Sequence, residues 1–572
     1  MVAAALFLCL LVTVSYAQRT SSNSAELHFD RAVTLLGKQR VDLAIAELNA
    51  AIRLRPDYAD AHNVIGLAYA RKGDLARAEA SFRKAIELDP ASYKAHRNLG
   101  LALQQGGKTD EAIAAFNQSV ALKPDDAETR LLLGSAFQQK ADADAAIEQF
   151  KEAVRLNPQS SAAHSNLGFL LGTKGLLREA VSELEQALEL EPSNGQAHYY
   201  LGTARWFLGD VEKALVALRS AVKRMPNHAE SHYYLGLALR KRGENPGAAP
   251  RATPGGVAEN KHAMGQPLQP DADLDEAIGE FRTAARLKPG LVEAHNELGL
   301  ALVQKRDPQG AIAAFNASLN LDAANIVANH NLGMALIQKG DYVAAIAQYR
   351  KLISLAPDNA EAHYNLALAL KSGDKLEEAI TELRRAIALQ PGLQEANYTL
   401  GVILLQQSKL DDAAAAFGAA VQGSAVYPEA LYALGTVQQQ QGKLDEAIAT
   451  LGEALKFAPD AAEIHNTLGT ALRQKGDLEA ARKEFQEAAR LNKLKSDMQA
   501  AMFATNTGIA MLKQGKVDAA IERLEAALKL DPNSVQAHLH LARAFQRKGR
   551  RAAAQAEYEK AKQLDPRLKP LQ

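Results

Sequence analysis

The most constraining feature of the sequence is a motif that recurs every 34 residues. A proline is followed ten residues later by glycine, and twelve residues after the glycine comes alanine, as in Pro56, Gly66 and Ala78. Fifteen copies account for residues 25–568 once one insert and one five-residue slip are allowed for. A repeat of this length that fills a chain predicts stacked supersecondary units rather than several globular domains.

Each copy is expected to form two antiparallel helices of about 14 residues. A Gly-Asp or Gly-Lys turn separates them, as at Gly73 and Gly107, because glycine adopts the left-handed conformation that ends a helix. The proline that closes each copy then stops the second helix. Apolar residues make up 47% of the chain but aromatic residues only 5%, so we expect a core built mainly from alanine and leucine.

This spacing resembles the tetratricopeptide repeat (TPR) family. The family places small residues at positions 8, 20 and 27 of each copy, a large apolar residue at position 24 and proline at position 32. Here position 20 is alanine in all fifteen copies, from Ala44 to Ala554, and position 32 is proline in twelve. The resemblance implies an all-α fold, a right-handed TPR superhelix (α-solenoid). Its concave surface would be lined mainly by the first helix of each copy, helix A, with helix B behind it.

Two segments depart from the repeat. Residues 244–272 contain five prolines and four glycines, so we expect a disordered insert within copy 7. A plain insertion and a regulatory loop both fit this composition. Residues Leu494–Met498 form the five-residue slip, an extra turn between copies 13 and 14 that should change the local twist. Residues 569–572 are left as a short tail after the last copy.

Residues 1–17 are typical of a secretory signal peptide. The uncharged run at residues 2–14 is too short to span a membrane, and small residues at Ser15 and Ala17 fit the cleavage rule. We expect export to the periplasm or the medium, with a mature chain that begins at Gln18 and carries a short segment, residues 18–24, before copy 1. A retained anchor and lipidation at Cys9 are the alternatives. After cleavage the chain would have no membrane span and no cysteine.

Charge and motifs exclude several classes of function. The chain has 66 basic and 66 acidic residues, a balance that argues against nucleic acid and anionic membranes as partners. The sequence contains none of the GxSxG, GxxxxGK[ST], HExxH or CxxCH motifs. Ten of the 14 histidines occupy position 4 of a copy, a full repeat apart, so they cannot converge on one metal ion. We therefore expect no enzyme, no cofactor and no metal site.

The positions of helix A that face the concave surface carry the candidate binding residues. Asparagine recurs at position 6 and tyrosine at position 5, and both can hydrogen-bond a ligand while tyrosine adds rigid apolar area. Trp206 lies seven residues after Tyr199, on the same helix face, and Tyr233 is one copy later, so these three should converge. Packing of Trp206 into the core is the alternative. The expected groove residues are Asn98, Asn166, Tyr199, Trp206, Tyr233, Asn331, Asn365, Tyr364, Tyr398 and Tyr432.

These observations predict a non-catalytic exported scaffold that binds protein or peptide ligands in its concave groove. The asparagine column also resembles the asparagine ladder in the TPR region of O-GlcNAc transferases, although Leu132, Tyr200, Tyr234 and Glu297 interrupt it here. That likeness keeps open a substrate-presenting partner of a glycosyltransferase, and an envelope assembly or secretion factor is a further alternative. The ligand and the oligomeric state are not determined by the sequence.

Overall fold

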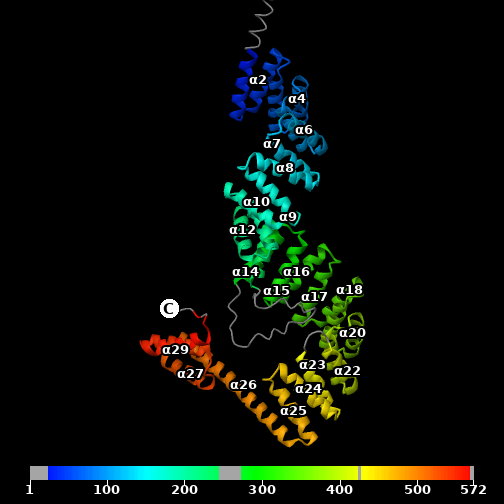
Figure 1. The fold of residues 1–572 in the computed structure, drawn as a ribbon, viewed down its shortest axis with the longest axis vertical. Coiled ribbons are helices and arrows are strands. Elements are labelled where there is room, and N and C mark those ends of the chain that lie inside the picture. Colours follow the sequence, from blue (N-terminus) through cyan, green and yellow to red (C-terminus); the bar gives the residue numbers. More distant parts are fainter. Residues whose placement is uncertain (1–23, 244–271, 423–426, 567, 569–572) are drawn as a thin grey trace, which may run out of the picture. The chain divides into compact units, whose positions relative to one another are not determined.

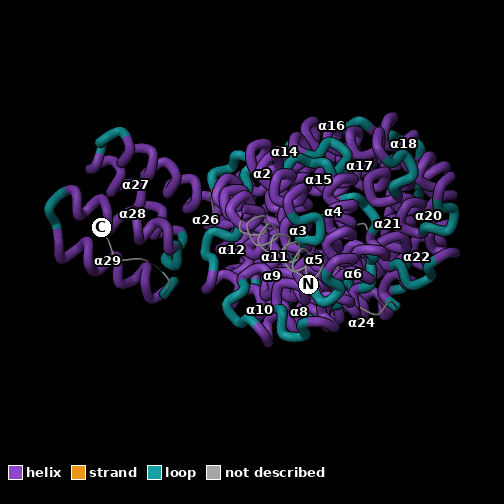
Figure 2. Tube along the Cα trace, turned by 90° about the horizontal axis from the view of Figure 1, so that it is seen from above, coloured by secondary structure: helices purple, strands orange, loops and turns teal. Residues whose placement is uncertain are grey.

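The computed structural model describes residues 24–243, 272–422, 427–566 and 568. Every regular element in these ranges is a helix (Figures 1 and 2), which confirms the all-α fold. The residues divide into two compact units, 1–248 with 272–297 and 249–271 with 298–572, and each is considered by itself. The expected signal peptide, the 18–24 segment, the 244–272 insert and the tail lie outside the described residues, apart from Ser24 and Ala272.

The first unit alternates helices A and B along the chain. Residues 24–37 form helix A of copy 1. The helices that follow are α2 (Val41–Leu54), α3 (Ala59–Arg71), α4 (Leu75–Leu88), α5 (Tyr93–Gln105), α6 (Thr109–Leu122), α7 (Ala127–Gln139), α8 (Ala143–Leu156), α9 (Ser161–Thr173), α10 (Leu177–Leu190), α11 (Gly195–Phe207), α12 (Val211–Arg224), α13 (Ala229–Gly243), α14 (Ala272–Leu287) and α15 (Val292–Gln304), which begins in this unit.

The second unit continues the alternation with one exception, the long helix α26. Its helices are α16 (Pro308–Leu321), α17 (Ile326–Lys339), α18 (Tyr342–Leu355), α19 (Ala360–Ser372), α20 (Leu376–Leu389), α21 (Gln394–Gln406), α22 (Leu410–Val421), α23 (Pro428–Gln440), α24 (Leu444–Phe457), α25 (Ala462–Lys475), α26 (Leu478–Lys513), α27 (Val517–Leu530), α28 (Val535–Arg547) and α29 (Arg551–Leu564). No helix among the described residues is long and apolar enough to cross a membrane.

Small residues let the two helices of a copy approach closely. In copy 4, a Cβ atom added to Gly134 would lie 2.6 Å from Cε1 of Phe150, which is fully buried. Ala146, at position 20, is also completely buried between the helices. The turn favours glycine for a different reason, since φ is +77° at Gly73, although Ala141 adopts a φ of +63° at the same position of copy 4. Both observations confirm the roles expected for the small residues.

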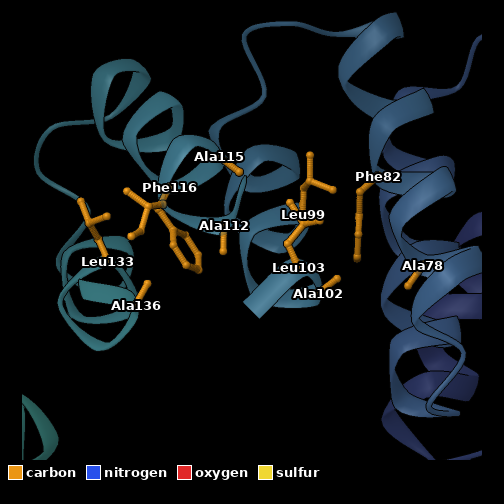
Figure 3. Packing of buried hydrophobic residues seen from close by; sticks show 11 residues of the cluster. Ala78, Phe82, Leu99, Ala102, Leu103, Ala112, Ala115, Phe116, Leu133 and Ala136 are labelled. Carbon is orange, nitrogen blue, oxygen red and sulfur yellow. The ribbon is translucent and has the colours of Figure 1, made fainter. Parts of the chain in front are cut away.

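The apolar core continues from one copy to the next. Figure 3 shows Phe82 of α4, Leu99 and Leu103 of α5, Phe116 of α6 and Leu133 of α7 as members of one buried cluster. Helix B of each of these copies packs on helix A of the following copy. Each helix pair contacts only the copies directly before and after it. The stability of the array therefore depends on the contacts between copies as well as on those within each copy.

Histidine at position 4 ties three parts of a copy together. Nδ1 of His164 lies 2.6 Å from a carboxylate oxygen of Glu183 on helix B, and Nε2 lies 3.1 Å from the carbonyl oxygen of Pro158. The ring therefore connects helix A to helix B with one nitrogen and to the preceding loop with the other. We call this pair of contacts the histidine clasp. It also joins His232 to Glu280 and Pro226, His363 to Glu382 and Pro357, His465 to Glu484 and Pro459, and His538 to Glu557 and Pro532.

Helix α26 joins two copies without a break. It contains helix B of copy 13 and helix A of copy 14 in one helix of 36 residues, and the extra turn at Leu494–Met498 is part of it. No proline or glycine occurs between Gly476 and Gly508, and Lys493 occupies the position of the closing proline. Helix α25 packs at Leu491, and α27 packs further along α26 (Figure 1). The missing proline thus removes a helix boundary.

Candidate functional site

The first unit contains a pocket built mainly from the A helices of three consecutive copies, with Leu177 at the start of α10 as the one contribution from a helix B. Helices α9, α11 and α13 contact one another in that order and present their inner columns side by side. The hollow has a volume of about 210 Å³, and α11 contributes the largest share of its wall. We call it the aromatic pocket. It is lined by Gly168, Phe169, Gly172, Thr173, Leu177, Tyr199, Tyr200, Thr203, Ala204, Phe207 and Tyr234.

Five aromatic rings surround this pocket in a connected chain. The rings of Phe169 and Tyr200 have centroids 4.5 Å apart, and Tyr200 lies 5.4 Å from Tyr199. Tyr234, one copy later, is 6.1 Å from both Tyr199 and Phe207. These separations are typical of tilted and edge-to-face aromatic pairs, which stabilise one another beyond their buried area. The rings are therefore held in place without a ligand.

The pocket is electrically neutral. None of its lining side chains is charged. Burial raises the pKa of Tyr199, with smaller contributions from Tyr234 and Glu230, and burial also raises the pKa of Tyr200 and of Tyr234. Their hydroxyl groups stay protonated at neutral pH and remain hydrogen-bond donors. An ionic ligand would find no counter-charge on this surface.

The structure places the three residues expected to converge in different surroundings. Tyr199 lines the aromatic pocket. Trp206 is half-buried and is not among the lining residues, whereas its neighbour Phe207 lines the pocket and is 62% exposed. Tyr233 is not among the lining residues, and its ring lies 5.3 Å from Tyr234 and 6.2 Å from Phe281 of the core. Of the three, Tyr199 alone reaches the pocket wall.

The asparagine column does not present a uniform surface. In the first unit, the amide of Asn98 is buried and donates to the side chain of Asn63 at 2.9 Å, while Asn166 is half-buried. In the second unit, Asn331 is half-buried, whereas Asn365 has no exposed surface. Asn365 thus faces protein on all sides in this structure, and Asn98 keeps only 8% of its surface exposed.

The other expected tyrosines belong to the second unit. Tyr364 is buried, and Tyr398 and Tyr432 are half-buried. Tyr398 packs against the core ring of Phe417 at 5.7 Å and against Tyr427 at 5.1 Å. These contacts give Tyr398 a packing role between neighbouring helices.

Sequence reasoning missed Phe169, Tyr200 and Tyr234 as pocket residues. The two tyrosines occupy position 6, where they were treated only as interruptions of the asparagine column. Their occurrence in consecutive copies was the available signal, because the same column in adjacent copies lies side by side. Phe169, at position 9, carried no comparable signal.

Comparison with known families decides the identity of the fold. The family described as tetratricopeptide repeat matches overlapping segments between residues 29 and 252, then 271–326, 371–428 and 432–496. The chain belongs to the tetratricopeptide repeat family. A family described as TPR repeat matches 333–373 and 508–549, and a further tetratricopeptide repeat family matches 535–568. The resemblance inferred from the spacing is therefore confirmed.

Several solved structures resemble parts of this TPR protein. YrrB, described as a TPR protein with an unusual peptide-binding site, is 24% identical, covers 34% of this chain and 97% of its own, and has a TM-score of 0.30. PilF of Pseudomonas aeruginosa is 18% identical over 37% and 96%, with a TM-score of 0.35. MamA of Desulfovibrio magneticus RS-1 is 27% identical over 30% and 97%, with a TM-score of 0.28. Comparison with curated sequences finds no significant match.

Proposed function

We propose that this TPR protein is a non-catalytic scaffold that binds an extended segment of a partner protein, with the aromatic pocket as the anchor. The observation that carries the proposal is an uncharged pocket walled by aromatic rings on the A helices. Its volume of about 210 Å³ is below the range of about 300–1,000 Å³ typical of sites for small molecules. A pocket of this size suits one side chain of a polypeptide.

The chemistry of the pocket selects the anchor side chain. Phe207 and Tyr234 offer edges and faces to an aromatic or large aliphatic group, and no charge is available to hold an ionic one. Aromatic residues that meet in a concave site are typical of binding hot spots. We therefore expect segments with an exposed Phe, Tyr, Trp, Leu or Met to bind, and segments rich in charge not to bind.

A peptide array tests the pocket directly. Short random peptides are screened with the full chain, and the affinity of the best binder is measured for Phe207→Ser and for the control Val216→Ser. Val216 is 68% exposed on α12 and lines no part of the pocket. We expect at least tenfold weaker binding for Phe207→Ser only, about 1.4 kcal/mol. Equal affinities for both variants, or binders that are all charged, would contradict the proposal.

We further propose that the chain is exported. The support is the uncharged run at residues 2–14 followed by Ser15 and Ala17. N-terminal sequencing of the protein from a host that exports it should begin at Gln18. Protein that keeps Met1, or that stays in the cytoplasm, would refute export and leave the peptide-binding proposal untouched.

A further inference from the structure

Position 3 of helix A lies on the surface where each copy packs against the copy before it. In thirteen copies this position holds a residue that is at most 4% exposed, and the residue is small in most of them. In copy 14 the same position holds Phe503, which is 74% exposed. The buried members are Ala61, Ala95, Thr129, Ala163, Ala197, Ser231, Ala294, Ala328, Ala362, Ala396, Ala430, Ile464 and Ala537.

Contacts between copies explain why this column is buried. The hydroxyl groups of Ser119, at position 27 of copy 3, and Thr129, at position 3 of copy 4, lie 3.2 Å apart. Glu185, at position 25 of copy 5, pairs with Arg205, at position 11 of copy 6. Helix B of one copy therefore covers the side of the next helix A that contains positions 3 and 11, which we call its leading face. We call the covering side of helix B the trailing face of its copy. In α26 those two helices are one continuous helix, so nothing in the described part of the chain covers Phe503.

The matching half of the interface is also uncovered. The trailing face of copy 13 contains a hollow of about 460 Å³, lined by Arg473, Leu478, Ala481, Arg482, Phe485, Gln486 and Ala489. Phe485 at position 24 is half-buried, although its counterparts Phe417 and Leu451 are fully buried. In the described part of the second unit, the trailing faces of copies 8 to 12 and of copy 14 contact the next copy. The trailing face of copy 13 is uncovered because helix A of copy 14 continues in line with α26 and does not fold back onto it.

We propose that the leading face of copy 14 docks on the trailing face of copy 13 in a second molecule of this chain. The leading face is formed by Met502, Phe503 and Ala510, all exposed. Each face is one half of the interface that joins the other copies, and their central rings, Phe485 and Phe503, both belong to α26. Two molecules can thus exchange the two faces about a twofold axis, which closes the assembly as a dimer.

The chemistry of the two faces supports this occupant. The guanidinium group of Arg473 lies over the ring of Phe485, 5.4 Å from its centroid, and Arg482 lines the same hollow. Guanidinium groups favour an aromatic ring, and Phe503 supplies one. The corresponding face of copy 15 instead carries the exposed polar residues Gln555 and Lys562, at positions 21 and 28.

A single molecule cannot make this contact while α26 is intact. Gln486 and Met511 occupy positions 25 and 11, the pair that Glu185 and Arg205 bridge at another junction. On one helix these residues are separated by 25 steps of about 1.5 Å, roughly 37 Å. That distance exceeds the span of a short cross-linker, so a product between them must join two chains.

Cross-linking tests the exchange. The full chain carrying Gln486→Cys and Met511→Cys in a Cys9→Ser background is treated with a short bismaleimide, and each single-cysteine variant serves as a control. We expect a covalent dimer for the pair and much less for either single variant. A product within one chain would show that α26 folds back, and the absence of a product would leave both faces unpaired in solution. Either result overturns the proposal.

Self-association provides a second measurement. Light scattering after size exclusion should show a dimer of the 61.5 kDa chain, and Phe503→Ser should raise its dissociation constant by more than tenfold. The control is Val343→Ser, because Val343 is also an exposed apolar residue of the second unit. Circular dichroism should not distinguish the variants, since both positions are exposed. A monomer at every concentration, or equal effects of the two variants, would refute the proposal.

Discussion

At the scale of single residues, the histidine clasp shows how one side chain coordinates a whole copy. His232 on α13 reaches Glu280 on α14 with one ring nitrogen and the carbonyl oxygen of Pro226 with the other. The proline belongs to the loop that precedes helix A, so the ring joins the loop and both helices. These two contacts give the ring a structural role.

The clasp predicts a pH dependence of stability. The hydrogen bond to Glu280 raises the pKa of His232 above its ordinary value, and this outweighs burial, which acts in the opposite direction. Because the pKa is raised in the folded state, the stabilisation is fully present below the unfolded pKa of about 6.5 and is lost as pH rises through the folded value. Urea unfolding at a series of pH values should show this loss for the wild type and a smaller one for His232→Gln.

A second residue-scale prediction concerns the buried asparagines. Neither amide atom of Asn365 has a hydrogen-bond partner, although the residue has no exposed surface. Replacing an unpaired buried amide with an apolar group of similar size removes a desolvation cost, so Asn365→Leu should raise the unfolding free energy by about 1 kcal/mol. Asn98→Leu is the matched control and should lower it, because Asn63 would lose its partner. Destabilisation by Asn365→Leu would show that this amide is paired in solution.

At the scale of helices, the contact of position 8 with position 24 determines how tightly a copy closes. Gly134→Ala should destabilise the protein, because overpacking against Phe150 costs about 1–3 kcal/mol and exceeds the gain in helix propensity of about 0.5–1 kcal/mol. Gly279→Ala is the control. Nothing lies near its added Cβ atom, so it should be neutral or stabilising in the same urea titration.

A compensating change tests whether that contact is the cause. Copy 10 already combines Ala367 at position 8 with Leu383 at position 24, and both are buried. Phe150→Leu should therefore cost less in the Gly134→Ala background than in the wild type, a coupling visible in a double-mutant cycle. Strict additivity would place the cost of Gly134→Ala elsewhere.

Sequence spacing predicted the helices well because each boundary has a local chemical cause. The Gly73 turn, the closing prolines and the small residue at position 20 all act within one copy. The continuous helix α26 was predicted only as an extra turn, because its cause is the absence of a proline at Lys493, and three copies lack that proline. The pocket was predicted in part: Tyr199 was expected, whereas Tyr200 and Tyr234 depend on contacts between copies.

At the scale of the whole molecule, stability is a sum of contacts between neighbouring copies. A copy that lacks a neighbour on one side is therefore less stable than the others. The middle of α26, around Leu494 and Met498, is a weak point of this kind, since both side chains are exposed and lie between the parts that α25 and α27 cover. Copies 14 and 15 are thereby joined to copy 13 by a single helix.

Hydrogen exchange should reveal this weak point. We expect the backbone amides of residues 494–498 to exchange faster than those near Leu512, because local opening there breaks few apolar contacts. Measurement by mass spectrometry on the Phe503→Ser variant, in which the proposed dimer is weakened, gives the comparison for the single chain. Uniform protection along α26 would indicate that another surface covers the middle of the helix.

The nearest-neighbour contacts also govern how fast the chain folds. Even the bond that Lys288 donates to Glu230 across the insert joins residues only 58 positions apart in a chain of 572. Such low contact order places folding in the fast regime, and early copies can form while later ones are still being synthesised. If the chain leaves the cytoplasm unfolded, as a cleaved leader implies, translocation competes with the rapid folding of the early copies. Translocation must then keep pace with translation, or a holding chaperone must delay the first hairpins.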